Sequence, residues 1–169
     1  SGVPRLEVSA GERLLVTGEN GSGKSTLLYA LAGDLTPASG TVGTVRGVRV
    51  GLMEQDLALG ADRRTVREAL AQAQGEDVDA YGLVAPRDLG RAVGDLSVGT
   101  RRRMVLALLM AQAPEVLLLD EPTNHLSLAL ADELTEALEG WPGAVVIASH
   151  DRWLRRRWTG RVLELKSRA

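Results

Sequence analysis

The sequence of 169 residues contains no cysteine and no phenylalanine, only two histidines, and aromatic residues at just 3% of positions. Without cysteine, the chain can have no disulfide scaffold, no Cys-ligated zinc site and no thiol nucleophile. Two histidines are too few for most His-rich metal sites. The longest apolar run, residues 104–111, is far too short to span a bilayer. The core must therefore be built from Leu, Val and Ala, and no membrane insertion is expected.

Net charge is also low. Twenty Lys and Arg against 22 Asp and Glu give −2 at pH 7, so the surface as a whole is no general nucleic-acid binder. Lysine occurs only at Lys24 and Lys166, so arginine supplies 18 of the 20 positive charges, and a specific task is expected for a lysine in such a chain. A hydrophobic fraction of 44% and this length are typical of one compact globular domain with room for a small subdomain.

Apolar runs alternate with helical patterns along the chain. Strands are expected at 12–18, 48–53, 116–119, 143–148 and 162–165. Helices are expected at 24–31, 63–74, 98–112, 128–138 and 151–158. This alternation predicts an α/β fold with a parallel sheet and right-handed crossovers. The helix-rich stretch 57–96 has no strong strand pattern and is expected to form a helical insert.

The sharpest pattern is GENGSGKS at residues 18–25, which matches GxxxxGK[ST] in full. It lies between an apolar strand and a helix, the context in which such a loop binds phosphate. Glycines let backbone N–H groups turn toward phosphate oxygens, and the next helix presents its positive end. Lys24 can reach the β- and γ-phosphates, and the Ser25 hydroxyl can ligate Mg²⁺. The candidate nucleotide-binding residues here are Gly18, Glu19, Asn20, Gly21, Ser22, Gly23, Lys24, Ser25 and Thr26.

Two carboxylates, Asp120 and Glu121, follow the apolar strand 116–119. The carboxyl end of a strand is where ligands bind in open α/β sheets. Alone, such a pair is usually part of a solvated loop. Downstream of a complete phosphate loop, we expect Asp120 to hold Mg²⁺, directly or through water. Glu121 is expected to orient or deprotonate the attacking water.

Residues 96–100, LSVGT, open a helix that continues with three arginines at 101–103. Here the chain resembles the ATP-binding cassette (ABC) ATPases, whose signature LSGGQ opens a helix shortly before the Walker B strand. The resemblance implies that Ser97 and Gly99 contact, in trans, the ATP bound to a second cassette. Read without the family, Ser97 is an ordinary N-cap residue, and the arginines are a solvated helix face.

Two more residues fit the same family. Gln55 ends a predicted strand, as the Q-loop glutamine does, and by resemblance it senses Mg²⁺ and the attacking water. His150 follows strand 143–148, as the switch histidine does, and by resemblance contacts the γ-phosphate. Five motifs thus occur in family order across residues 5–165.

The resemblance implies a P-loop NTPase fold of the ABC nucleotide-binding type, with a mainly parallel central sheet and a small helical subdomain. Its cofactors would be ATP and Mg²⁺. The implied catalytic residues are Glu121, His150 and Gln55, and the implied metal ligands are Ser25, Gln55 and Asp120. The expected division is an ATPase core at 1–56 and 97–169 and a helical subdomain at 57–96.

Residues 121–126 (EPTNHL) and 149–152 (SHDR) resemble the ABC-F subfamily, whose soluble tandem cassettes act on ribosomes. Residues 141–165 resemble the second cassette of actinobacterial members linked to antibiotic resistance. This implies a cytoplasmic ATPase that pairs with a second cassette and has the ribosome or rRNA, and not DNA, as a partner. The chain is expected to be a fragment of a longer tandem-cassette protein.

The sequence also departs from the family pattern. Val98 and Thr100 replace a glycine and a glutamine of the signature, and Ser127 stands where the subfamily has an aspartate that helps couple the two ATP sites. No aromatic residue precedes the phosphate loop, although the family stacks adenine on one. A single cassette holds half of each ATP site, so the isolated chain is expected to hydrolyse ATP slowly or not at all.

The nearest alternative is the ATP-binding subunit of an ABC transporter, which carries almost the same motifs. The run TNHL at 123–126 disfavours it, and so does the short stretch 55–96, because that stretch would have to bind a membrane partner. A module that holds ATP without cleaving it is disfavoured by Glu121 but favoured by Val98 and Ser127.

Two further classes of protein account for fewer of these motifs. The heads of chromosome-maintenance ATPases separate the phosphate loop from the signature by a long coiled coil, and residues 24–96 show no sustained heptads. A P-loop kinase or GTPase would explain Lys24 and Asp120. It would leave Gln55, Ser97 and His150 together unexplained.

Overall fold

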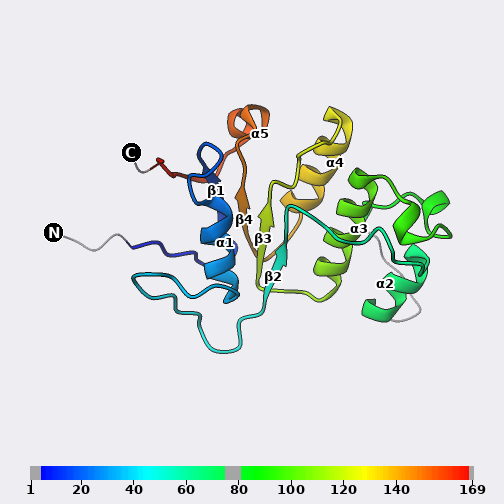
Figure 1. Cartoon of the computed structure of the whole chain (residues 1–169), viewed down its shortest axis with the longest axis horizontal. Helices are drawn as coiled ribbons and strands as arrows, with labels where there is room; N and C mark the ends of the chain where they lie inside the picture. The colour runs from blue at the N-terminus through cyan, green and yellow to red at the C-terminus, as the bar shows by residue number, and fades with distance from the viewer. Residues whose placement is uncertain (1–4, 75–80, 168–169) are drawn as a thin grey trace.

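The computed structural model describes residues 5–74 and 81–167 (Figure 1). Its elements, in chain order, are β1 (Arg13–Thr17), α1 (Lys24–Ala32), β2 (Val50–Met53), α2 (Val66–Gln74), the 3₁₀ turns η1 (Pro86–Asp88) and η2 (Val93–Asp95), α3 (Val98–Ala111), β3 (Val116–Asp120), α4 (Leu128–Glu139), β4 (Ala144–Ala148), α5 (Arg152–Arg157) and β5 (Arg161–Glu164). The predicted alternation of strands and helices is confirmed.

The five strands form one sheet in the order β2-β3-β4-β1-β5, and every neighbouring pair is parallel. The fold is therefore of the predicted α/β class with a parallel central sheet. Because the strands run in one direction, the residues that follow β1, β3 and β4 emerge at the same edge. The register pairs Asp120 at the end of β3 with Ala148 at the end of β4, so the residues after them are neighbours.

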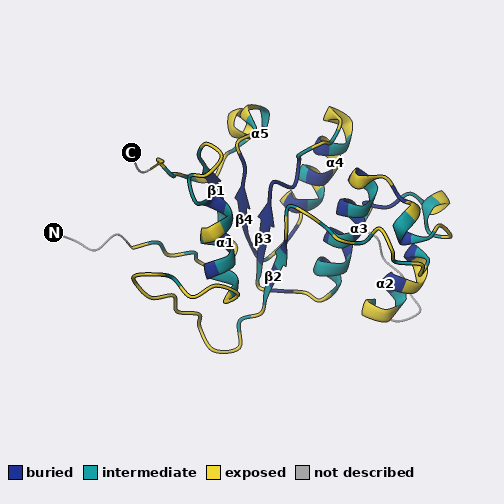
Figure 2. Ribbon diagram, viewed as in Figure 1, coloured by how far each residue is buried: buried dark blue, intermediate teal, exposed yellow. Residues whose placement is uncertain are grey.

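The strands are apolar on both faces because helices cover both faces (Figure 2). Alternate residues of each strand separate into two clusters. On one face α1 covers Leu14, Val16, Leu118 and Val146. On the other face the helices α2, α3 and α4 share a larger cluster with Leu15, Leu117, Leu119, Val145 and Ile147. α1 and α3 therefore lie on opposite faces of the sheet (Figure 1).

The start of α2 differs from the sequence prediction, which placed it at residue 63. The helix begins at Val66 because Thr65 and Glu68 form a capping box. The Thr65 amide donates to the Glu68 carboxylate at 2.7 Å, and the Glu68 amide donates to the Thr65 hydroxyl at 3.1 Å. These two bonds fix the first helical turn three residues later than the apolar pattern suggested.

Between β2 and α3 the chain forms α2 and the two 3₁₀ turns, which pack through an isolated bridge between Thr65 and Ala92. Part of the expected helical subdomain, residues 75–80, lies outside the described residues. None of the described helices combines the length and the apolarity that crossing a bilayer would need.

Arg13 joins the first strand to the end of α4 and the turn that follows it. Its guanidinium donates to the carbonyl groups of Gly143 at 2.6 Å, Leu138 at 3.2 Å and Trp141.

We expect Arg13→Met to lower the free energy of unfolding by about 1–3 kcal/mol, because it leaves these part-buried carbonyl groups without their donor. Chemical denaturation measures the change, with Arg46→Met in an exposed loop as the control. Equal midpoints for the two variants would contradict the expectation.

Candidate functional site

The glycine-rich loop 18–23 joins β1 to α1. Gly18 and Gly23 have positive φ angles of 152° and 96°. At Gly18 a Cβ atom would lie 2.5 Å from Ser22 Oγ and 2.6 Å from the carbonyl oxygen of Leu165, so only glycine fits there. The loop therefore brings the backbone tightly to the N-terminus of α1, where N–H groups can face an anion.

Lys24 is the first residue of α1 and only 6% exposed. Its Nζ donates to the carbonyl oxygens of Gly18 at 2.6 Å and Glu19 at 3.0 Å. These carbonyl groups hold the ammonium over the loop, where it could exchange them for phosphate oxygens. Ser22 Oγ in the same loop is buried and has no hydrogen-bond partner within residues 5–74 and 81–167. Asn20 in this loop and Thr26 in α1, which the sequence predicts as nucleotide-binding residues, are both exposed.

Asp120 ends β3 next to the loop and is almost fully buried. Burial raises the pKa of its carboxyl group, as does the nearby Glu121, whereas a hydrogen bond with Ser25 and the charge of Lys24 lower it. Its Oδ1 is buried and has no partner in the described part of the chain.

A buried carboxylate oxygen beside a hydroxyl group suits Mg²⁺, a hard cation that prefers oxygen ligands. Within the described residues, no group of three or more His, Asp or Glu side chains could hold a metal alone. Mg²⁺ commonly takes one or two protein ligands and completes its shell with phosphate and water. Ser25 and Asp120 could therefore hold Mg²⁺ together with a nucleotide.

Glu121 and His150 come together at the same edge of the sheet. His150 Nδ1 lies 2.7 Å from Glu121 Oε1, and when the carboxylate is ionised it can only accept, so Nδ1 is then the donor. Glu121 is 4% exposed, and its backbone φ of 49° is unusual for a residue with a side chain. Its amide donates to the Ala148 carbonyl oxygen at 2.8 Å, which anchors the residue to the end of β4.

Thr123 and Asp151 tie together the segments that carry this pair. Thr123 Oγ1 donates to Asp151 Oδ2 at 2.9 Å, and the Asp151 amide donates to Ser149 Oγ at 3.0 Å. Asp151 also caps α5, as its place before the helix predicts. The sequence analysis did not connect Thr123 with Asp151, although each stands one or two residues beyond a candidate catalytic residue.

The remaining candidates, Ser97, Gly99 and Gln55, come from the start of α3 and the end of β2. Ser97 caps α3 by accepting from the Thr100 amide at 3.2 Å. A Cβ atom at Gly99 would lie 2.9 Å from a Leu126 side-chain carbon. Both residues open α3, across the sheet from α1 (Figure 1). Gln55 follows β2, the strand next to β3.

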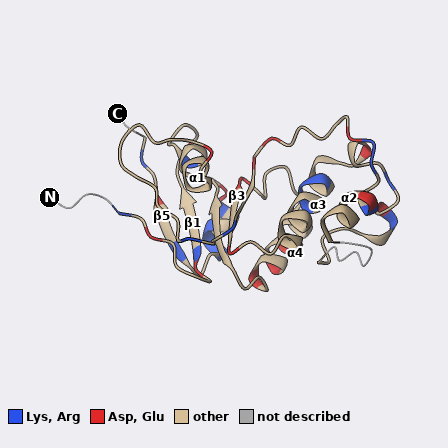
Figure 3. Ribbon diagram, turned by 90° about the horizontal axis from the view of Figure 1, so that it is seen from below, with Lys and Arg blue, Asp and Glu red and all other residues tan. Residues whose placement is uncertain are grey.

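The arginines of α3 correct one expectation. The sequence pattern alone predicts a solvated helix face at residues 101–103, but Arg102 is 4% and Arg103 8% exposed. Arg103 pairs with Glu133 of α4 at 3.1 Å. Arg102 donates to the carbonyl oxygens of Glu121 at 2.6 Å and Gln55 at 2.7 Å. Figure 3 shows this positive charge on α3, between α4 and the chain leading to α2.

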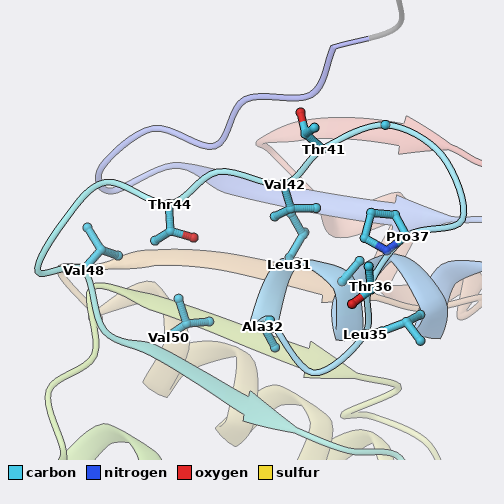
Figure 4. A pocket seen from close by; sticks show the side chains of 13 residues that line it. Leu31, Ala32, Leu35, Thr36, Pro37, Thr41, Val42, Thr44, Val48 and Val50 are labelled. Atoms are coloured by element: carbon cyan, nitrogen blue, oxygen red, sulfur yellow. The ribbon is translucent and has the colours of Figure 1, made fainter.

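A cavity lies elsewhere in the structure. It measures about 640 Å³ and is bounded by the C-terminal end of α1 and the segment 35–50. Figure 4 shows Val42, Val48 and Val50 around it. Its lining offers threonine hydroxyl groups but no charged side chain. The groups that could bind a triphosphate are therefore at the other end of α1, in the open loop and the adjoining strand ends.

Comparison with known proteins agrees with this geometry. A family model described as ABC transporter matches residues 3–124. The tylosin resistance ATP-binding protein TlrC of Streptomyces fradiae is 50% identical over 171 residues, which cover 97% of this chain and 31% of TlrC. The ATP-binding protein YheS of Haemophilus influenzae is 43% identical over 160 residues, covering 90% of this chain and 25% of YheS. The chain thus spans between a quarter and a third of these relatives.

Solved structures show the same fold. The dimeric structure of MJ0796, a bacterial ABC transporter cassette, has a TM-score of 0.77 at 22% identity, over 95% of this chain and 84% of that one. A post-hydrolysis state of the same cassette, bound to ADP and Pi, also has a TM-score of 0.77, at 21% identity over 97% and 86% of the two chains.

Proposed function

The chain belongs to the ABC transporter family of ATP-binding cassettes, and from that premise we propose that it binds ATP with Mg²⁺ and hydrolyses the terminal phosphate bond. We further propose that it works as one cassette of a pair, in a protein of the ABC-F type that acts on the ribosome. The observation that supports hydrolysis best is the Glu121–His150 contact of 2.7 Å. It lies at the edge of the sheet where the phosphate loop and Asp120 also end.

The proposed chemistry follows from the roles that these groups can play. His150 holds one oxygen of the Glu121 carboxylate, which leaves the other to accept a proton from a water molecule. As that water attacks the γ-phosphorus, the bond between the phosphorus and the bridging β–γ oxygen breaks, and ADP leaves with the electron pair. Lys24 offsets negative charge on the phosphate oxygens, because its ammonium lies over the loop that would hold them.

Ser25 and Asp120 are the residues that would hold the metal ion, and the family resemblance adds Gln55. When bound, Mg²⁺ neutralises charge on the phosphate oxygens. Asp120 is suited to this task because its buried, unpartnered oxygen is costly in the protein alone. A positive ion would offset that cost.

Pairing with a second cassette is proposed from the position of Ser97 and Gly99. Both open α3 on the face of the sheet opposite to α1, so they lie far from the loop of their own chain but could face the nucleotide of a partner. The similar cassette MJ0796 has been solved as a dimer, which supports this arrangement. A single chain would then turn over ATP slowly.

The ribosome is proposed as the partner from the relatives and the sequence motif, taken as one ground, and from the surface of α5 as another. The relative TlrC is named for resistance to tylosin, and the EPTNHL run resembles ribosome-acting members of the family. The second ground is the basic helix α5. Arg157 is held by Asp132 at 2.8 Å and stacks on Trp153 at 4.6 Å, whereas Arg155 and Arg156 are exposed beside it. Exposed arginines suit the phosphate groups of rRNA.

The test uses Glu121→Gln in a longer protein that contains this chain. With ATP added to a cell lysate, the variant should remain on ribosomes through fractionation, because the closed ATP-bound state cannot be released by hydrolysis. Retention on membranes with a transmembrane partner, and none on ribosomes, would instead favour the ATP-binding subunit of an ABC transporter. Combining the variant with Arg155→Glu and Arg156→Glu should weaken retention most at low salt and make it less sensitive to added salt, because fewer phosphate contacts remain to be screened. Unchanged affinity at all salt concentrations would remove α5 from the ribosome contact.

A further inference from the structure

The buried Arg102 occupies an unusual place on α3. It lies just over one turn after the Ser97 cap, and its side chain runs from α3 to two other parts of the candidate site. Nη1 donates to the Glu121 carbonyl oxygen at 2.6 Å, and Nη2 donates to the Gln55 carbonyl oxygen at 2.7 Å. One guanidinium thus links α3 to two other segments of the chain. Glu121 lies 19 residues after Arg102, and Gln55 lies 47 residues before it.

Stability alone gives a poor account of this arginine. The residue is 4% exposed, its hydrogen bonds are to neutral carbonyl groups, and its Nε is buried without a partner in the described residues. Burial lowers the pKa of its guanidinium, while the negative charges of the nearby Asp56, Glu121 and Asp120 raise it. The adjacent Arg103 is buried too, but it forms an ion pair with Glu133. An apolar side chain at position 102 would avoid the cost of burying a charge.

The Glu121 backbone shows what Arg102 can supply. A non-glycine residue at a φ of 49° is held in a sparsely populated conformation, which persists only where several contacts define it. On the amide side the Ala148 carbonyl oxygen accepts at 2.8 Å. On the carbonyl side the donors are the Asn124 amide at 3.2 Å and Arg102. The shorter of these two bonds, and the one from outside the turn, is that of Arg102.

We propose that Arg102 is a positioning residue, which holds the backbones of Glu121 and Gln55 so that their side chains face the terminal phosphate and the attacking water. The inference rests on the proposed ATP hydrolysis, because it assigns Arg102 a part in that same site. The planar fork of arginine is needed, since a lysine ammonium is a single point of donation and cannot span both carbonyl groups in the same way.

The test compares Arg102→Met, Arg102→Lys and Arg103→Met in the full chain. We expect Arg102→Met to lower kcat roughly 10- to 100-fold with little change in KM for ATP, since a displacement of about 1 Å can cost about 100-fold in rate. Arg102→Lys should recover part of the loss. Arg103→Met removes the ion pair with Glu133 and should lower stability without lowering kcat selectively. An equal loss of kcat in both methionine variants, or a change confined to KM, would overturn the proposal.

A second measurement needs no turnover. Without nucleotide, Arg102→Met should speed amide hydrogen exchange in peptides covering residues 53–59 and 119–126, where the two carbonyl groups lie, and Arg103→Met should not. The same exchange pattern in both variants would overturn the proposal. If instead the wild-type chain neither binds nor hydrolyses ATP, the proposed function fails, while the exchange data still decide whether Arg102 holds these two segments.

Discussion

Glutamine in place of Glu121 is expected to leave ATP affinity nearly unchanged and to lower the rate of hydrolysis by about 100- to 10,000-fold, the usual contribution of a positioned proton acceptor. The amide has the same shape as the carboxylate, and its oxygen can still accept from His150 Nδ1 in the contact of 2.7 Å. The Glu121 amide keeps its bond to Ala148. Only the capacity to take a proton from water is lost.

The measurement combines phosphate release with titration of a fluorescent ATP analogue. Rates are recorded at several chain concentrations, because the proposed pairing makes turnover per chain depend on concentration. Glu139→Gln, an exposed glutamate at the end of α4, is the matched control and should change neither quantity. Full turnover in Glu121→Gln would mean that another group accepts the proton. Loss of ATP affinity would instead place Glu121 in nucleotide binding.

The sequence predicts the local part of this structure well. The strand, glycine-rich loop and helix around residues 12–31 follow from an apolar run, a turn and a helical pattern that are contiguous in the chain. The caps at Ser97 and Asp151 also follow from short patterns, since each needs only a side-chain oxygen and an amide two or three residues later. The capping box of Thr65 and Glu68 was equally readable, and it would have placed the start of α2 correctly.

The contacts between distant segments could not be predicted from such patterns. That Glu121 meets His150 depends on β3 and β4 being neighbours in a register that pairs Asp120 with Ala148. No local feature of either strand states this order, and only the family resemblance implied that both residues belong to one site.

The burial of Arg102 and Arg103 was likewise not predictable from local sequence patterns. Three successive arginines are usually solvated, and periodicity cannot show which of them faces a neighbour. Arg102 is buried because the carbonyl groups of Gln55 and Glu121 converge on its position, and Arg103 because α4 presents Glu133. The prediction of a solvated face was therefore wrong for a reason that lies outside the helix. A charged residue becomes an acceptable core residue where tertiary structure supplies acceptors.

The second large effect is expected for Lys24→Met, which keeps most of the side-chain stem and removes the ammonium. We expect ATP affinity to fall about 10- to 100-fold, because a hydrogen bond to a charged group contributes about 1.5–3 kcal/mol and each 1.4 kcal/mol is about tenfold in affinity. The fold should survive, since the bonds that Lys24 makes are to two carbonyl groups of its own loop.

Lys166→Met is the matched control, because Lys166 is the only other lysine in the sequence and is exposed beyond β5. Calorimetric titration with ATP and Mg²⁺ should separate the two variants, and thermal unfolding should not. Wild-type affinity in Lys24→Met would show that the glycine-rich loop is a structural turn whose lysine only closes it. A loss of affinity that accompanies unfolding would assign Lys24 to stability. A loss with the fold intact would assign it to the nucleotide, which explains why this arginine-rich chain has a lysine at the start of α1.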